Sequence, residues 1–128
     1  MTKSTEEKSS QHLILLAEDD QLSSSYFRAV LSSEGYEIIH VDNGADVVEV
    51  VRNNPRVSLV LMDIKMPVKS GVEAAKEIRS FNKTVPLIAQ TAFALAGDKS
   101  TIMKAGFSDY VTKPISRQDL IAVVKRFM

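Results

Sequence analysis

The stretch Leu59-Val60-Leu61-Met62-Asp63-Ile64-Lys65-Met66-Pro67 decides the fold of this chain, because an apolar run ends there in a single carboxylate. Strands that are covered on both faces of a parallel sheet are continuously apolar, so residues 57–63 are predicted to form a buried central strand. Asp63 then stands at the carboxyl end of that strand, the edge at which open α/β sheets bind their ligands. A carboxylate in this position is costly unless it is paired or bound, so Asp63 is the first candidate functional residue.

Strands and helices are predicted to alternate along the whole chain. The predicted strands cover residues 13–17, 36–41, 57–63, 85–91 and 109–112. Two predicted helices run over residues 21–34 and 94–105, and three others follow the cap candidates Asn43, Ser70 and Ser116. Right-handed crossovers between parallel strands place helices on both faces of the sheet. The fold class is therefore α/β, a doubly wound five-stranded parallel sheet with the flavodoxin-like strand order 2-1-3-4-5.

The apolar spacing within the helices predicts which residues face the core. In the first helix, Leu22, Tyr26 and Val30 recur at helical spacing. In the helix after Ser70, the expected inward face carries Val72, Ala75 and Ile78, and Ser70 with Glu73 forms a capping-box pattern. The helix over residues 94–105 is the weakest, since Gly97 lies within it and apolar residues are few.

Composition limits the classes of function. The chain has 128 residues, a formal net charge of zero and no cysteine. One domain is expected over residues 12–128, preceded by a polar, disordered lead-in or linker over residues 1–11. The charge balance argues against nucleic acid or an acidic membrane as partner. The absence of cysteine excludes disulfides and thiolate metal sites and suits a reducing compartment, so a cytoplasmic location without direct membrane contact is expected.

Polar residues collect at the predicted carboxyl edge of the sheet. Four of the five strands end there in chemically useful side chains, which are Glu18 and Asp19, Asp63, Thr91, and Lys113. Three carboxylates in one cleft repel one another unless a cation lies among them. Oxygen ligands without His or Cys favour a hard ion, and Mg²⁺ fits best. A carboxylate nucleophile with a metal, a lysine and a hydroxyl is what phosphoryl transfer requires.

These residues carry a resemblance to the receiver domain of response regulators in two-component signalling, over about residues 13–127. It depends on four motifs in the same order: Leu15-Leu16-Ala17-Glu18-Asp19-Asp20, Leu61-Met62-Asp63-Ile64-Lys65-Met66-Pro67, Gln90-Thr91-Ala92 and Asp109-Tyr110-Val111-Thr112-Lys113-Pro114. The sequence around Asp63 and around Gly106 is similar to that of receivers fused to hybrid histidine kinases. In place of the Asp that commonly precedes Gly71 in the family, this chain has Ser70.

The resemblance implies a role for each site residue. Asp63 is the expected phosphoacceptor, and the Mg²⁺ ligands are Asp19, Asp63, the backbone carbonyl of Lys65 and, through water, Glu18. Thr91 and Lys113 are expected to bind phosphoryl oxygens, Tyr110 is the aromatic switch, and Lys113-Pro114 is a peptide bond that is often cis in the family. Lys65 and Phe93 stand where the family varies the phosphoryl lifetime.

The function implied is a phosphoacceptor module of a phosphorelay. The implied partner is a histidine kinase or a histidine-phosphotransfer protein, and the chain is expected to be a monomer or weak dimer. It catalyses only its own phosphorylation and dephosphorylation, so it is not an enzyme toward other substrates. Phosphorylation is expected to change the surface formed by the fourth helix, the fifth strand and the last helix.

Three other functions are weighed against this one. An aspartyl-nucleophile phosphatase of the haloacid-dehalogenase type has a second Asp two residues after the nucleophile, where this chain has Lys65. A flavodoxin-like cofactor binder needs a Gly- or Ser/Thr-rich phosphate loop after the first strand, where Glu18-Asp19-Asp20 repels phosphate. A degenerate receiver that acts only as a docking module lacks the acceptor, the lysine or the acidic pair, and all of these are present here.

Overall fold

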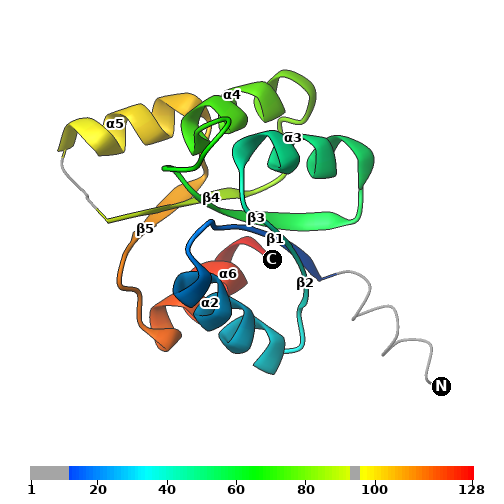
Figure 1. Cartoon of the computed structure of the whole chain (residues 1–128), viewed down its shortest axis with the longest axis vertical. Coiled ribbons are helices and arrows are strands. Elements are labelled where there is room, and N and C mark those ends of the chain that lie inside the picture. Colours follow the sequence, from blue (N-terminus) through cyan, green and yellow to red (C-terminus); the bar gives the residue numbers. More distant parts are fainter. Residues whose placement is uncertain (1–11, 93–95) are drawn as a thin grey trace.

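The computed structural model describes residues 12–92 and 96–128 and contains one parallel sheet with helices on both faces (Figure 1). Its strands are β1 (Leu13–Ala17), β2 (Glu37–Val41), β3 (Val57–Asp63), β4 (Leu87–Thr91) and β5 (Asp109–Thr112). Its helices are α2 (Gln21–Ser33), α3 (Gly44–Asn53), α4 (Gly71–Phe81), α5 (Ala96–Ala105) and α6 (Arg117–Phe127). The strand order is β2-β1-β3-β4-β5, which confirms the predicted topology.

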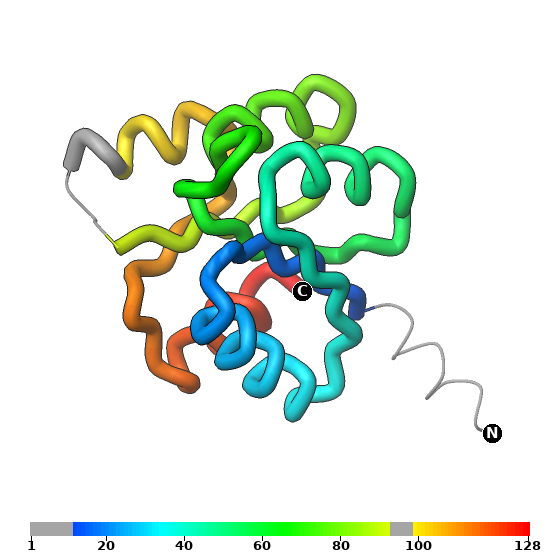
Figure 2. Tube along the Cα trace, in the orientation of Figure 1, coloured from blue at the N-terminus to red at the C-terminus, as the bar shows by residue number. Residues whose placement is uncertain are grey.

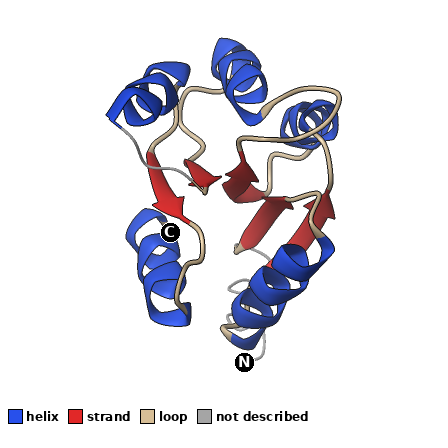
Figure 3. Ribbon diagram, turned by 60° about the vertical axis from the view of Figure 1, so that its left-hand side comes forward, coloured by secondary structure: helices blue, strands red, loops and turns tan. Residues whose placement is uncertain are grey.

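The sheet separates two apolar cores, and Figure 3 shows helices on both of its faces. Helices α3, α4 and α5 cover one face, on which Val60, Met62 and Leu87 lie in the first core. Helices α2 and α6 cover the other face, where Leu61, Ile88 and Phe27 belong to the second core. Because side chains alternate between the faces of a strand, β1, β3 and β4 supply apolar side chains to both cores. The path in Figure 2 shows how the right-handed connections place the helices there.

Cap residues set where the helices begin. Side chains of Asp20, Asn43, Ser70 and Ser116 each accept a hydrogen bond from the backbone N–H three residues later. At α4 the bond is reciprocal, since the carboxylate of Glu73 accepts from the N–H of Ser70, which confirms the predicted capping box. Gly35, with a φ of +90°, follows the C-cap of α2 and allows the chain to turn into β2.

Some sequence predictions of helix faces and bounds are wrong. Leu22 is 84% exposed and Tyr26 is 39% exposed, and the inward face of α2 is formed instead by Phe27, Val30 and Leu31. Leu22 and Tyr26 instead line a cavity beside the loop that carries Lys113. In α4 the predicted Ala75 and Ile78 are buried together with Ala74, and Val72 is partly buried and packs against the first core.

Predicted and observed bounds differ at three elements. Strands β2 and β4 begin one and two residues later than predicted, at Glu37 and Leu87, and α2 ends one residue earlier, at Ser33. The start predicted for the next-to-last helix at residue 94 lies outside the described residues. Pro86 has no N–H for the sheet ladder, which explains why β4 begins only after it. Within the described ranges, no helix is long and apolar enough to cross a membrane.

Candidate functional site

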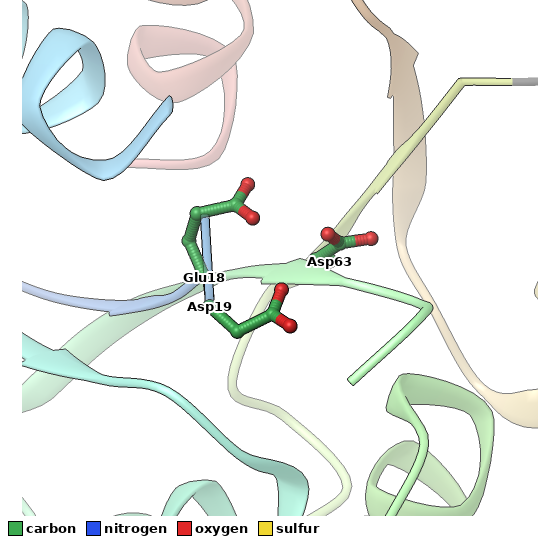
Figure 4. Close-up of side chains that lie close together, drawn as sticks. All are labelled: Glu18, Asp19 and Asp63. Atoms are coloured by element: carbon green, nitrogen blue, oxygen red, sulfur yellow. The ribbon is translucent and has the colours of Figure 1, made fainter. Parts of the chain in front are cut away.

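Three carboxylates meet at the carboxyl edge of the sheet. Glu18 and Asp19 follow β1, and Asp63 ends β3. One carboxylate oxygen from each residue lies within 4.8 Å of the others, and the three side chains point toward a common space (Figure 4). Strands β1 and β3 are neighbours whose connections leave to opposite faces of the sheet, so their ends border an open crevice. The predicted convergence of these residues is confirmed.

Lys113 bridges the acidic residues from the loop between β5 and α6. Its Nζ donates to Oε1 of Glu18 at 2.7 Å and to Oδ2 of Asp63 at 3.1 Å. The Glu18 side chain is fully buried, whereas 13% of the Asp63 side chain and 23% of the Lys113 side chain are exposed. One positive charge thus faces two carboxylates, and the exposed Asp19 lies beside them.

Backbone contacts fix the position of Asp63. Its Oδ1 accepts a hydrogen bond from the N–H of Lys65 at 3.0 Å, and the next residue, Ile64, donates its N–H to the carbonyl of Gln90 at 3.2 Å. Gly71, at the start of α4, packs directly against this turn: a Cβ there would lie 2.5 Å from the Asp63 carbonyl oxygen. Only glycine allows α4 to begin so close to the end of β3.

The electrostatics of the site show an excess of negative charge. Burial raises the pKa of Glu18, with a smaller contribution in the same direction from the charge of Asp63, although hydrogen bonds from Lys113 and from the backbone of Asp20 work against it. Burial works to lower the pKa of Lys113, but its hydrogen bond to Glu18 and the charge of Asp63 outweigh burial and raise that pKa. Lys113 therefore stays charged but cannot neutralise all three carboxylates.

The donor set fits a hard divalent cation. All three side chains offer oxygen, one of them is exposed to solvent and the cluster is open enough to keep water ligands on the ion, as Mg²⁺ requires. The ligands predicted for Mg²⁺ include these three residues. The ligand role of the Lys65 carbonyl stays a prediction; the Lys65 N–H donates to Oδ1 of Asp63.

The two other predicted residues lie beside the acidic cluster rather than in it. Thr91 ends β4 and is 4% exposed, one position beyond the pairing of Gln90 with Asp63. Tyr110 lies on the edge strand β5, is partly buried and packs against the first core, with Nζ of Lys99 5.8 Å from the centre of its ring. Phe93 lies outside the described residues. The peptide bond between Lys113 and Pro114 is cis, as the resemblance implied.

Three supporting residues were missed by sequence reasoning. The hydroxyl of Tyr26 donates to the carbonyl of Ile115 at 2.9 Å and so joins α2 to the loop that carries Lys113. The Nε2–H of His40 donates to the carbonyl of Glu18 at 2.8 Å. Gln90 is wholly buried beside Asp63 in the sheet register. None of these contacts has a signal in sequence spacing, because each joins residues that are far apart in the chain.

Comparison with known proteins is consistent with this geometry. The sequence model of the response regulator receiver domain matches residues 14–125. The polar-differentiation response regulator DivK of Brucella anthropi is 35% identical over 117 residues, which cover 90% of this chain and 94% of DivK.

Solved structures show the same fold. The receiver domain of the sensor histidine kinase PA1611 from Pseudomonas aeruginosa, solved with a magnesium ion in its active-site cleft, has a TM-score of 0.85 and 36% identity, covering 91% of this chain and 96% of that one. The chemotaxis response regulator CheY4 of Vibrio cholerae shares the fold with a TM-score of 0.85 at 22% identity, over 92% of this chain and 99% of CheY4.

Proposed function

Because the chain belongs to the response regulator receiver domain family of two-component signalling, we propose that it accepts a phosphoryl group on Asp63. One observation carries the proposal. The Asp63 carboxylate stands at the end of β3 next to the acidic pair Glu18 and Asp19, and it accepts a hydrogen bond from the ammonium of Lys113. A carboxylate that faces both a candidate cation site and a fixed positive charge is placed for nucleophilic attack on phosphorus.

Mg²⁺ is the cofactor in this proposal, and it would be held by Asp19, Asp63, the Lys65 carbonyl and, through water, Glu18. When bound, it supplies charge neutralisation for the phosphoryl oxygens. The magnesium ion in the related receiver of PA1611 supports this choice. A cation would also stabilise the ionised carboxylates of the cluster, since burial works against ionisation of Glu18.

The transfer step uses this chain's own residues in defined roles. An oxygen of Asp63 attacks the phosphorus of a phosphohistidine, the P–N bond breaks and the electron pair stays on the imidazole. Lys113 is already within 3.1 Å of an Asp63 oxygen, so its ammonium can follow the charge that develops on the transferred group. Thr91, at the end of the neighbouring strand, would donate its hydroxyl to a phosphoryl oxygen.

The output of the proposed switch is the surface of α5, β5 and α6. A phosphoryl group adds negative charge and acceptor oxygens beside Thr91, and movement of Thr91 would open space for Tyr110. Tyr110 faces the side of the sheet on which α5 lies, and α5 has the weakest amphipathic pattern of the helices. An element with few anchors has a low cost of rearrangement, which is what a switch needs.

Receiver domains interact with histidine kinases or histidine-phosphotransfer proteins, and we propose such a protein as the phosphodonor. The proposal covers a cytoplasmic receiver, either as a separate regulator or as part of a membrane-anchored hybrid kinase. The protein is a monomer or weak dimer and acts on its own phosphoryl group alone.

Intact-mass spectrometry after incubation with acetyl phosphate and MgCl₂ tests the proposal. We expect one added phosphoryl group on the native protein, none on Asp63→Asn, and none on the native protein after EDTA treatment. Asp46→Asn is a matched control, because Asp46 lies in the exposed first turn of α3. Equal labelling of Asp63→Asn and the native protein would show that another residue is the acceptor.

A further inference from the structure

Gln90 carries a polar side chain that is wholly buried. It lies on β4 with 0% exposure, and among the described residues neither its Nε2 nor its Oε1 has a hydrogen-bond partner. A buried carboxamide that has no hydrogen-bond partner pays the free energy of desolvation without compensation. An apolar residue of the same shape has no such cost. The other β4 side chains that belong to the cores are apolar, namely Leu87, Ile88 and Ala89.

The register of the sheet places this carboxamide beside the phosphoacceptor. Gln90 pairs with Asp63 of β3 on one side and with Val111 of β5 on the other. Side chains of paired residues in a parallel sheet point to the same face, and Ile88, two residues before Gln90, lies in the core under α2 and α6. Gln90 therefore faces α2 and α6, on the same side of the sheet as Asp63.

Lys113 must cross the strand that carries Gln90. It follows β5, yet its Nζ donates to Asp63 at the end of β3 and to Glu18, the residue after β1. In the sheet, β4 lies between β5 and β3. Lys113 lines a cavity together with Phe27, which belongs to the α2 and α6 side. The lysine thus passes over β4 on the face from which the Gln90 carboxamide projects.

We propose that Gln90 is a positioning residue that pairs with Lys113 when Asp63 carries a phosphoryl group; the inference rests on the proposed function. In the unphosphorylated protein Glu18 and Asp63 accept hydrogen bonds from two N–H groups of the ammonium, and the carboxamide has no partner within the described part of the chain. After transfer, one Asp63 oxygen is bonded to phosphorus and the lysine turns to the phosphoryl oxygens. This turn brings an ammonium N–H to Oε1 of Gln90, directly or through one enclosed water.

This arrangement would make the phosphorylated state easier to form. The cost of the unpaired carboxamide belongs to the unphosphorylated state and is relieved in the phosphorylated one. A side chain that is worse bonded in one state of an equilibrium shifts that equilibrium toward the other state. Gln90 would thus lower the stability of the unphosphorylated protein and favour the phosphorylated state.

Beryllofluoride with MgCl₂, a stable mimic of the aspartyl phosphate, tests the inference on the full chain. The apolar isostere Gln90→Met is expected to raise Tm without ligand, because a buried unpaired group is removed. It is also expected to weaken half-saturation by beryllofluoride by about tenfold, which corresponds to about 1.4 kcal/mol. Mg²⁺ affinity measured alone by calorimetry should change little, since Gln90 is not among the proposed ligands.

Two further variants distinguish this role from packing. Gln90→Leu, of a different shape, should behave like Gln90→Met, and Ser24→Ala, which removes another buried polar group of the same face, should leave beryllofluoride affinity unchanged. Unchanged beryllofluoride affinity in both Gln90 variants overturns the inference, and so does an affinity loss that only follows a loss of Tm. Failure of the native protein to bind beryllofluoride would instead overturn the proposed function.

Discussion

Replacement of Lys113 by Met tests how much of the site depends on one positive charge. Methionine keeps most of the aliphatic stem and removes the ammonium that bridges Glu18 and Asp63. The change leaves three carboxylate side chains within 4.8 Å of one another, one of them fully buried, without a cation. We expect the variant to fold and to be less stable than the native protein in the absence of divalent ions.

The size of the loss follows from burial. Removal of one partner of a buried ion pair costs about 3–5 kcal/mol. Here Lys113 and Asp63 keep 23% and 13% of their side chains exposed, so solvent screens part of the interaction and the lower part of the range applies. We therefore expect the free energy of unfolding to fall by about 3 kcal/mol. At a Mg²⁺ concentration about 100 times the dissociation constant, binding to the folded state returns about 2.7 kcal/mol.

Urea denaturation followed by circular dichroism, with and without MgCl₂, measures both effects. Mg²⁺ is expected to stabilise Lys113→Met more than the native protein, because the ion no longer competes with an ammonium for the carboxylates. Lys76→Met is the control, since Lys76 is exposed in α4, away from the cluster. If Lys113→Met is as stable as the native protein without Mg²⁺, or if Mg²⁺ stabilises both equally, the charge balance inferred for the site is wrong.

Three other changes have defined outcomes. Tyr26→Phe removes the 2.9 Å hydrogen bond to the Ile115 carbonyl and should lower the free energy of unfolding in urea by about 1 kcal/mol and slow labelling by acetyl phosphate. Val68 has a φ of +68° and is 84% exposed, so Val68→Gly should raise that free energy by about 0.5–1 kcal/mol, and a decrease would contradict the strain. A hydrogen bond from Lys69 lowers the pKa of Glu77 below its ordinary 4.5. The ionised Glu77 therefore stabilises the folded protein above pH 4.5, and this contribution is lost as the pH falls further. Tm of Glu77→Gln should decline less steeply in acid than Tm of the native protein.

The acidic cluster shows why part of the site could be predicted from sequence. Glu18 and Asp19 follow β1, Asp63 ends β3 and Lys113 follows β5, and parallel strands bring their carboxyl ends to one edge. The topology alone therefore places these side chains near one another, without knowledge of any rotamer. The capping box at Ser70 and Glu73 was predictable for the same reason, because it needs only local spacing.

The contacts around this cluster could not be predicted in the same way. Apolar spacing in α2 predicted that Tyr26 faces the core. In the structure its hydroxyl donates a hydrogen bond to the carbonyl of Ile115, 89 residues away. The strained backbone of Val68 has no sequence signal, since neither Asn nor Gly stands there. Both depend on how α2 and the loop after β3 lie against their neighbours, which periodicity does not contain.

Sequence by itself determined the order of strands and helices, the sheet topology and the carboxylate at the end of β3, because apolar runs and caps are local and parallel crossovers have one hand. Only the tertiary structure decided that Lys113 bridges Glu18 and Asp63, and that the Gln90 side chain has no hydrogen-bond partner among the described residues. The physical reason is that hydrogen bonds between distant residues depend on register and side-chain direction to within about an ångström, and a pattern along the chain specifies neither.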